Sequence, residues 1–144
     1  WEHAKPRDVE RVVADLGVQD WVDSLADGLA TSVGERGDQL SAGERQLVAL
    51  LRAGLADPDV LILDEATSSV DALTEVRIAR ALERLAATRT TIAIAHRLST
   101  AARADRVLVL DHGVLVEDGH HDDLIMRDGA YRRLYDAWVS ATTV

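Results

Sequence analysis

The stretch Val60 to Asp71, VLILDEATSSVD, is the part of the sequence from which the fold of the rest of the chain is predicted. Four apolar residues lead directly into two adjacent carboxylates, Asp64 and Glu65. A short apolar run between polar residues predicts a strand that is buried on both faces, and the preceding Asp57-Pro58-Asp59 predicts the end of a helix. Because ligands of open α/β sheets bind at the carboxyl ends of the strands, we expect both acids to lie beside a ligand site.

The two acids suit two different tasks in phosphate chemistry. One carboxylate can hold Mg²⁺, directly or through water. Its neighbour, which points elsewhere on the pleat, can orient or deprotonate an attacking water. An ordinary strand that ends in a polar turn shows the same local pattern, so the surrounding motifs have to decide between the two interpretations.

The composition excludes several classes of protein. With 144 residues, of which 47% are hydrophobic, the chain is one domain or a large piece of one and can bury a core. It has no cysteine, which excludes disulfides, thiol catalysis and cysteine-based zinc sites. No signal peptide is visible, and no apolar run approaches the roughly 18 residues of a membrane span. The net charge of −9 argues against a nucleic-acid surface, although a nucleotide site needs positive charge only locally.

A second motif, LSAGE at Leu40 to Glu44, precedes an apolar helical pattern. Ser41, with Glu44 three positions later, predicts a capping box at a helix start. The same helix start would present free N–H groups and a positive dipole end to a phosphate, and Gly43 would let that phosphate approach the backbone. The local pattern alone favours the simple helix start.

The other expected elements before residue 96 are helices at Asp8 to Leu16 and around Gln19 to Ala26, a loop at Gly28 to Gln39, a helix at Ala72 to Ala87 and a second buried strand at Thr90 to Ala95. Asp71 is expected to cap the long helix. Its buried face would carry Val76, Ala79, Leu82 and Leu85. His96, at the carboxyl end of the second strand, would lie level with the two acids.

The last third of the chain predicts a hairpin and a packed helix. Asp111-His112-Gly113 is a hairpin signal between strands at Arg106 to Leu110 and Val114 to Glu117. For His120-His121-Asp122-Asp123 a polar loop and an acidic first helical turn are favoured over a metal site, because no third ligand is evident. The final helix, Ala130 to Ala141, would form a packing stripe of Tyr131, Leu134, Tyr135 and Trp138.

Taken together, these motifs resemble the nucleotide-binding domain of an ABC transporter. LSAGE resembles the family's signature motif, VLILDE resembles Walker B with the catalytic glutamate, and SSVD at Ser68 to Asp71 resembles the D-loop. His96 resembles the switch histidine. Three further stretches resemble the exporter branch: TSVGERG at Thr31 to Gly37, AHRLST at Ala95 to Thr100 and EDGHHDDL at Glu117 to Leu124.

The resemblance implies an α/β fold, with part of the parallel sheet of a P-loop NTPase (RecA-like), flanking helices and, before them, part of the helical subdomain. Residues 1–58 would be the remnant of the helical subdomain and end in the signature helix. Residues 59–144 would be the C-terminal half of the RecA-like ATPase core. The chain starts at Trp1 without a methionine, so we expect it to be a piece of a longer protein.

In this family, ATP is sandwiched between two nucleotide-binding domains packed head to tail. The resemblance implies that Asp64 positions Mg²⁺, that Glu65 polarises the attacking water and that His96 contacts the γ-phosphate. Ser41 and Gly43 would reach the γ-phosphate of ATP held by the partner domain. The signature residues that would bind nucleotide in this way are Leu40, Ser41, Ala42, Gly43 and Glu44.

The implied partners are the second nucleotide-binding domain and the transmembrane domain of the transporter, with no nucleic acid. Asp71 would couple the two ATP sites across the interface, and Glu35 and Arg36 would lie near the membrane-spanning part. The parent protein would act at the cytoplasmic face of the membrane, and the chain by itself would be soluble.

The chain departs from the family pattern in three places. Ala42 replaces a glycine of the commonest signature, and Glu44 replaces a glutamine, which adds negative charge close to a phosphate site. A phosphate-binding loop needs G-x-x-x-x-G-K-[ST], but the only lysine, Lys5, has no glycine loop around it. The base-stacking aromatic and the Q-loop glutamine would also lie upstream of Trp1. We therefore expect ATPase activity in the intact parent and none in the isolated chain.

The phosphate-loop strand would lie between the strands Thr91 to Ala95 and Arg106 to Leu110. Because unpaired strand edges template pairing, we expect one of three outcomes: direct pairing of these two strands, insertion of another copy's strand, or mobility of Arg106 to Val116.

Two other classes of function remain open. One is a soluble ABC-type ATPase that serves no transporter, and the other is a non-catalytic interaction module. Transmembrane helices encoded upstream would favour the exporter over the first, and a natural start codon immediately before Trp1 would favour the second.

Overall fold

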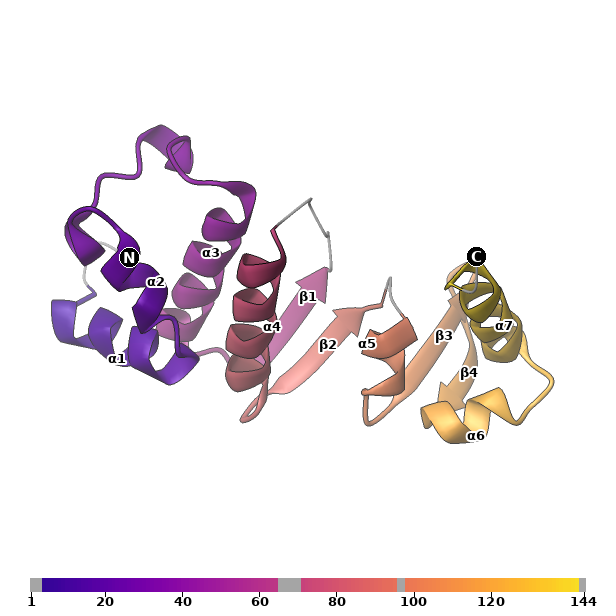
Figure 1. Ribbon diagram of the computed structural model, residues 1–144. Coiled ribbons are helices and arrows are strands. Elements are labelled where there is room, and N and C mark those ends of the chain that lie inside the picture. Colours follow the sequence, from indigo (N-terminus) through magenta and orange to yellow (C-terminus); the bar gives the residue numbers. More distant parts are fainter. Residues whose placement is uncertain (1–3, 65–70, 96–97, 143–144) are drawn as a thin grey trace. The chain divides into compact units, whose positions relative to one another are not determined.

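The computed structural model describes residues 4–64, 71–95 and 98–142. The chain forms two compact units, Trp1–Ile92 and Ala93–Val144, and each is described by itself (Figure 1). This boundary follows contacts within the chain. The expected division at residues 58 and 59 follows the subdomains of the family, and it stays a prediction.

The first unit contains a helical part followed by β-strands and a long helix. Its elements, in chain order, are α1 (Pro6–Leu16), α2 (Gln19–Ser24), the 3₁₀ turns Gly28–Ala30 and Glu35–Gly37, α3 (Ala42–Ala56), β1 (Val60–Asp64), α4 (Ala72–Ala86) and β2 (Thr90–Ile94), whose last two residues belong to the second unit. β1 pairs with β2, and the two strands run in the same direction (Figure 1).

The helix boundaries follow from local sequence signals. Proline suits the first turn of a helix, where its missing N–H is not needed, and Pro6 opens α1. Gly17 ends α1 with φ of 67°, a left-handed conformation that glycine adopts without steric cost. Asp57 follows the end of α3 and turns the chain toward β1. These boundaries confirm the expected positions of the elements.

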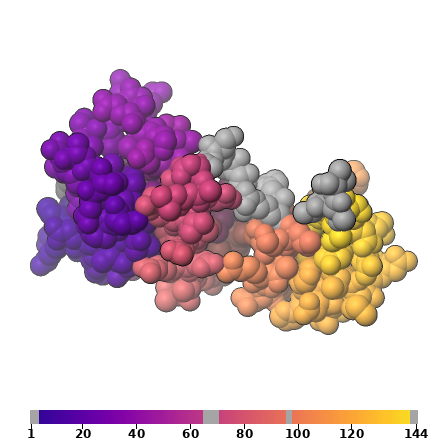
Figure 2. Space-filling view, in the orientation of Figure 1, coloured from indigo at the N-terminus to yellow at the C-terminus, as the bar shows by residue number. Residues whose placement is uncertain are grey.

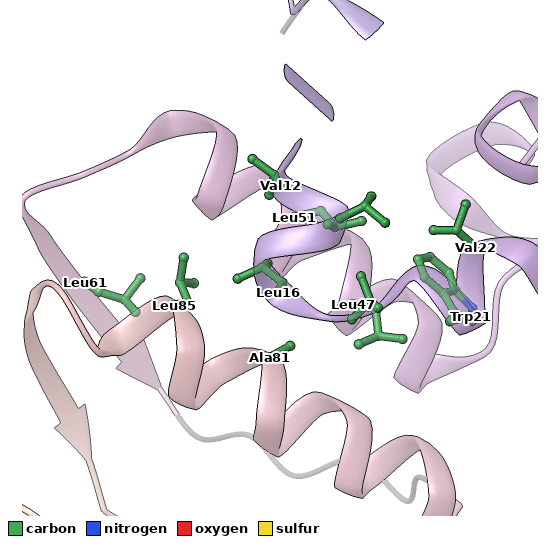
Figure 3. Close-up of a cluster of buried hydrophobic side chains, with 11 residues drawn as sticks. Val12, Leu16, Trp21, Val22, Leu47, Leu51, Leu61, Ala81 and Leu85 are labelled. Carbon is green, nitrogen blue, oxygen red and sulfur yellow. The ribbon is translucent and has the colours of Figure 1, made fainter. Parts of the chain in front are cut away.

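A hydrophobic core holds the helices of the first unit together (Figure 3). The buried side chains come from α1, α2, α3, β1 and α4, and they include Val12, Val13, Leu16, Trp21, Val22, Leu47, Leu51, Leu61, Ala81 and Leu85. A Cβ on Gly54 would lie 2.7 Å from Cγ1 of Val12, so the missing side chain at residue 54 lets α3 approach α1 closely. Val12, Val13 and Leu16 therefore form the core face of α1.

The burial expected for β1 and β2 is wrong in this chain. Leu61 is buried, but Ile62 on the opposite face is 70% exposed, and Ile92 and Ile94 of β2 are also exposed. The side chain of Leu61 packs into the helical core. Within the described residues of the first unit, no element covers the other face of the sheet, so period-2 alternation leaves that face open.

The expected inward face of α4 is also partly wrong. Leu85 is buried and Leu82 is partly buried, as predicted, but Val76 and Ala79 are exposed. Ala81 completes the buried face instead. The helix has apolar side chains on two sides, and α4 packs against α1 and α3 with only one of them. The residues on that side are 78, 81, 82 and 85.

The second unit is a β-hairpin packed with short helices. Its elements are α5 (Leu98–Ala102), β3 (Val107–Asp111), β4 (Val114–Gly119), α6 (His121–Ile125) and α7 (Ala130–Thr142). β3 and β4 are antiparallel, and the two-residue turn has positive φ at both His112 (47°) and Gly113 (79°), as a tight hairpin turn requires. The predicted hairpin is confirmed.

The polar stretch at residues 120–123 has a structural role. Nδ1 of His121 lies 2.7 Å from the hydroxyl of Tyr131, and Asp122 and Asp123 occupy the first turn of α6. Among the residues that the structure describes, no group of three His, Asp or Glu side chains could hold a metal ion. Tyr131 is buried as predicted, whereas Leu134 is exposed, because only part of the α7 stripe meets the unit's small core.

The strands of the two units form separate sheets. β2 is paired with β1, and β3 is paired with β4. The outcome expected for the edges of β2 and β3 stays a prediction. None of the helices in the described ranges has the length and apolar character that crossing a membrane requires.

We predict that Leu85→Ala lowers the free energy of unfolding of the first unit by about 2–5 kcal/mol, because it opens a cavity at a fully buried position. Leu73→Ala is the matched control, since Leu73 is on the same helix and 68% exposed; its change should stay within about 0.5 kcal/mol. Urea unfolding followed by tryptophan fluorescence measures both. Equal losses in the two variants would contradict the packing described for α4.

Candidate functional site

Three element ends gather at one end of the first unit. The carboxyl end of β1 and the N-termini of α3 and α4 point to the same side (Figure 1). Asp64 is the last residue of β1, Ser41 is the N-cap of α3 and Asp71 is the N-cap of α4. The structure therefore brings together three of the segments that the sequence singled out.

The start of α3 is held by the predicted capping box, which is confirmed. The backbone N–H of Glu44 donates to Oγ of Ser41 at 3.2 Å, and Oε2 of Glu44 accepts from the backbone N–H of Ser41 at 2.8 Å. The guanidinium of Arg45 donates to the carbonyl of Leu40, which fixes the residue before the cap. This geometry holds the first turn rigidly.

The capping box satisfies two of the four N–H groups that a helix start leaves without intrahelical partners. The two that the box does not use belong to Ala42 and Gly43. Both N–H groups lie at the positive end of the dipole of a 15-residue helix, which favours an anion. Gly43 is buried and Ala42 is partly buried. The loop at residues 28–39 leads toward this turn and lies on the surface of the unit (Figure 2).

Glu44 has a third hydrogen bond that the sequence did not suggest. The indole Nε1 of Trp21 donates to Oε1 of Glu44 at 3.3 Å. The hydrogen bonds from the backbone and side chain of Ser41 hold the pKa of Glu44 below its usual range, and the bond from Trp21 acts in the same direction. Glu44 is therefore a carboxylate at neutral pH.

Asp71 has a structural role at the start of α4. Its Oδ1 accepts from the backbone N–H of Thr74 at 3.0 Å, and this bond holds the pKa of Asp71 below its usual range. Its charge acts on Glu44 and opposes the lowering of that residue's pKa.

Asp64 is the described residue that could hold a metal. It is exposed at the end of β1, and a carboxylate oxygen is a ligand that Mg²⁺ prefers. One such ligand fits, because Mg²⁺ is bound by one or two carboxylates together with water and phosphate oxygens. Glu65 and His96, the predicted catalytic residues, lie outside the described residues.

The comparisons with known proteins agree with the motifs at this site. A family model described as "ABC transporter" matches residues 1–68. A protein of Bacillus subtilis (strain 168), the uncharacterized ABC transporter ATP-binding protein YknV, is 49% identical over 138 residues, which are 96% of this chain and 23% of that protein. The ATP-dependent lipid A-core flippase of Xylella fastidiosa (strain Temecula1) is 51% identical over 128 residues, which are 89% of this chain and 22% of the flippase.

A solved structure, of a bacterial Atm1-family ABC exporter with ATP bound, matches with a TM-score of 0.80 and 42% identity, covering 95% of this chain and 24% of the exporter chain. The chain spans less than a quarter of the length of the relatives it matches. The α/β fold expected from the sequence is confirmed. The chain belongs to the ABC transporter family and corresponds to part of the nucleotide-binding region of its exporters.

Proposed function

We propose that this chain is part of the ATP-hydrolysing domain of an ABC exporter and that it supplies the signature helix to an ATP site. The observation that carries the proposal is the start of α3, where the capping box fixes the turn and leaves the N–H groups of Ala42 and Gly43 for an anion. The match to exporters over nearly the whole chain supports the same assignment.

The proposed reaction is phosphoryl transfer to water, in which the protein contributes positioning and charge neutralisation. Asp64 would be a ligand of Mg²⁺ or of its waters, and a bound Mg²⁺ would neutralise charge on the phosphates. Glu65 would orient the attacking water and accept its proton. His96 would donate a hydrogen bond to the γ-phosphate.

The α3 start would act on ATP held by a second nucleotide-binding domain, packed head to tail. Ser41 and Gly43 would contact the γ-phosphate there, and the helix dipole would favour its negative charge. Asp71, which caps α4 close to α3, would couple the two ATP sites across this interface. Leu40, Ala42 and Glu44 would complete the signature turn.

The transmembrane domain of the exporter is the other proposed partner. Glu35 and Arg36 form a 3₁₀ turn in the loop that precedes the signature helix, and Arg36 holds a positive φ of 56°. This turn would lie near the membrane-spanning part, so that nucleotide-dependent movement of α3 reaches it through a short segment. The parent would then act at the cytoplasmic face of the membrane.

We predict that the isolated chain does not hydrolyse ATP. Its sequence contains no G-x-x-x-x-G-K-[ST], so it lacks the backbone cradle and lysine that hold the β- and γ-phosphates. Phosphate release by the purified chain, compared with that of its Glu65→Gln variant, is the measurement. Steady release that Glu65→Gln abolishes would show that the chain builds an active site by itself.

In the intact exporter we predict that Glu65→Gln lowers turnover by about 10²–10⁴, the usual contribution of one positioned base, while ATP still binds. The physical reason is that the amide cannot accept the proton of the attacking water, whereas Asp64 still serves the metal. Glu10→Gln, an exposed acid on α1, is the matched control and should leave turnover unchanged. Near-normal turnover with Glu65→Gln would remove Glu65 from the role of base.

A further inference from the structure

We propose that Trp21 is a positioning residue of the signature helix: its indole N–H donates to Oε1 of Glu44 and holds the carboxylate over the N-cap, where Oε2 accepts from the N–H of Ser41. The inference rests on the proposed function, because it assigns the α3 start to a phosphate. It also explains how a negative charge can occupy the position of the signature where the family most often has a neutral glutamine.

The indole is well placed to fix another group. Trp21 comes from α2, 23 residues before Glu44, and it is only 5% exposed. Its ring lies in the core beside Leu47 and Val22 (Figure 3), and its backbone carbonyl accepts from Oγ of Ser24. Because the ring is held by packing, the position of Nε1 is set by the core rather than by Glu44.

The donors match a carboxylate and not an amide. The backbone N–H of Ser41 and the indole N–H of Trp21 point at the two different oxygens of Glu44, Oε2 and Oε1. A carboxylate accepts at both oxygens, whereas a glutamine offers one acceptor and one NH₂ group. With glutamine at residue 44, one of these two N–H groups would therefore face the NH₂ group of the amide, which cannot accept a hydrogen bond.

Holding the carboxylate matters because of its charge. An ionised side chain in the first turn of α3 lies close to the N–H groups of Ala42 and Gly43, and like charge would repel a phosphate there. Among the described residues, the charge of Asp71 on α4 repels the carboxylate of Glu44, and the neutral donors of Ser41 and Trp21 hold it. Without the indole bond, Oε1 loses the partner that keeps it turned toward the core.

The bond itself can be tested in this chain without nucleotide. In ¹H–¹⁵N spectra at pH 7, we expect Glu44→Gln to shift the indole N–H resonance of Trp21, assigned through its loss in Trp21→Phe. The indole resonance of Trp138, in the other unit, should not move and serves as the internal control. An unchanged Trp21 resonance in a folded Glu44→Gln variant would overturn the inference, whatever the chain's function.

The role of the bond is tested by a double-mutant cycle in the intact exporter. With Glu44 present, Trp21→Phe keeps the aromatic packing but frees the carboxylate, and we expect it to raise the KM for ATP roughly tenfold, the value of one hydrogen bond to a charged group. With Gln at residue 44, the same Trp21→Phe change should have less than about a twofold effect, since no freed charge remains.

The possible results test the positioning role of Trp21 and the proposed function separately. Equal effects of Trp21→Phe in both backgrounds would show that Trp21 acts only through packing, and would overturn the positioning role. Trp138→Phe is the matched control and should leave KM unchanged. If Glu65→Gln fails to slow the same exporter, the proposed function fails, while the spectroscopic result on the Trp21–Glu44 bond stands or falls by itself.

Discussion

Everything in the first unit depends on the burial of one face of α3. Leu47 and Leu51 pack between α1 and α4, and Gly54 lets α1 come into close contact. This packing fixes the axis of α3, and the capping box at Ser41 and Glu44 fixes its first turn. A helix start can receive an anion only if its N–H groups are already oriented, so the hydrophobic core and the proposed phosphate contact are parts of one arrangement.

Trp21 connects this hydrophobic core to the signature turn. Its ring is a packing residue, and its N–H is a hydrogen-bond donor to Glu44. Tryptophan often combines these roles, because its large apolar ring is buried while its N–H needs a partner. A rigid core and a charged turn are thereby joined by a side chain from a helix that lies earlier in the chain. Changes in the packing of α2 should therefore alter the position of the Glu44 carboxylate in the signature turn.

Local signals in the sequence predicted local structure well. Ser41 and Glu44 form the capping box, Asp71 caps α4, and His112 and Gly113 form the hairpin turn, because each of these features depends on residues that are close in sequence. The burial of Ile62, Val76 and Leu134 was predicted wrongly, because burial depends on which distant element covers a face. The Trp21–Glu44 bond could not be predicted for the same reason. Nothing near Trp21 in the sequence indicated its partner, which lies 23 residues later.

We propose that the start of α3 meets the γ-phosphate of ATP held by a second nucleotide-binding domain. Photo-crosslinking of the intact exporter can detect this contact, with an ATP analogue that carries a photoreactive group on the γ-phosphate. We expect label within residues 40–44 of the subunit opposite the one that holds the nucleotide. Label confined to the nucleotide-holding subunit, with none in residues 40–44 of its partner, would contradict it.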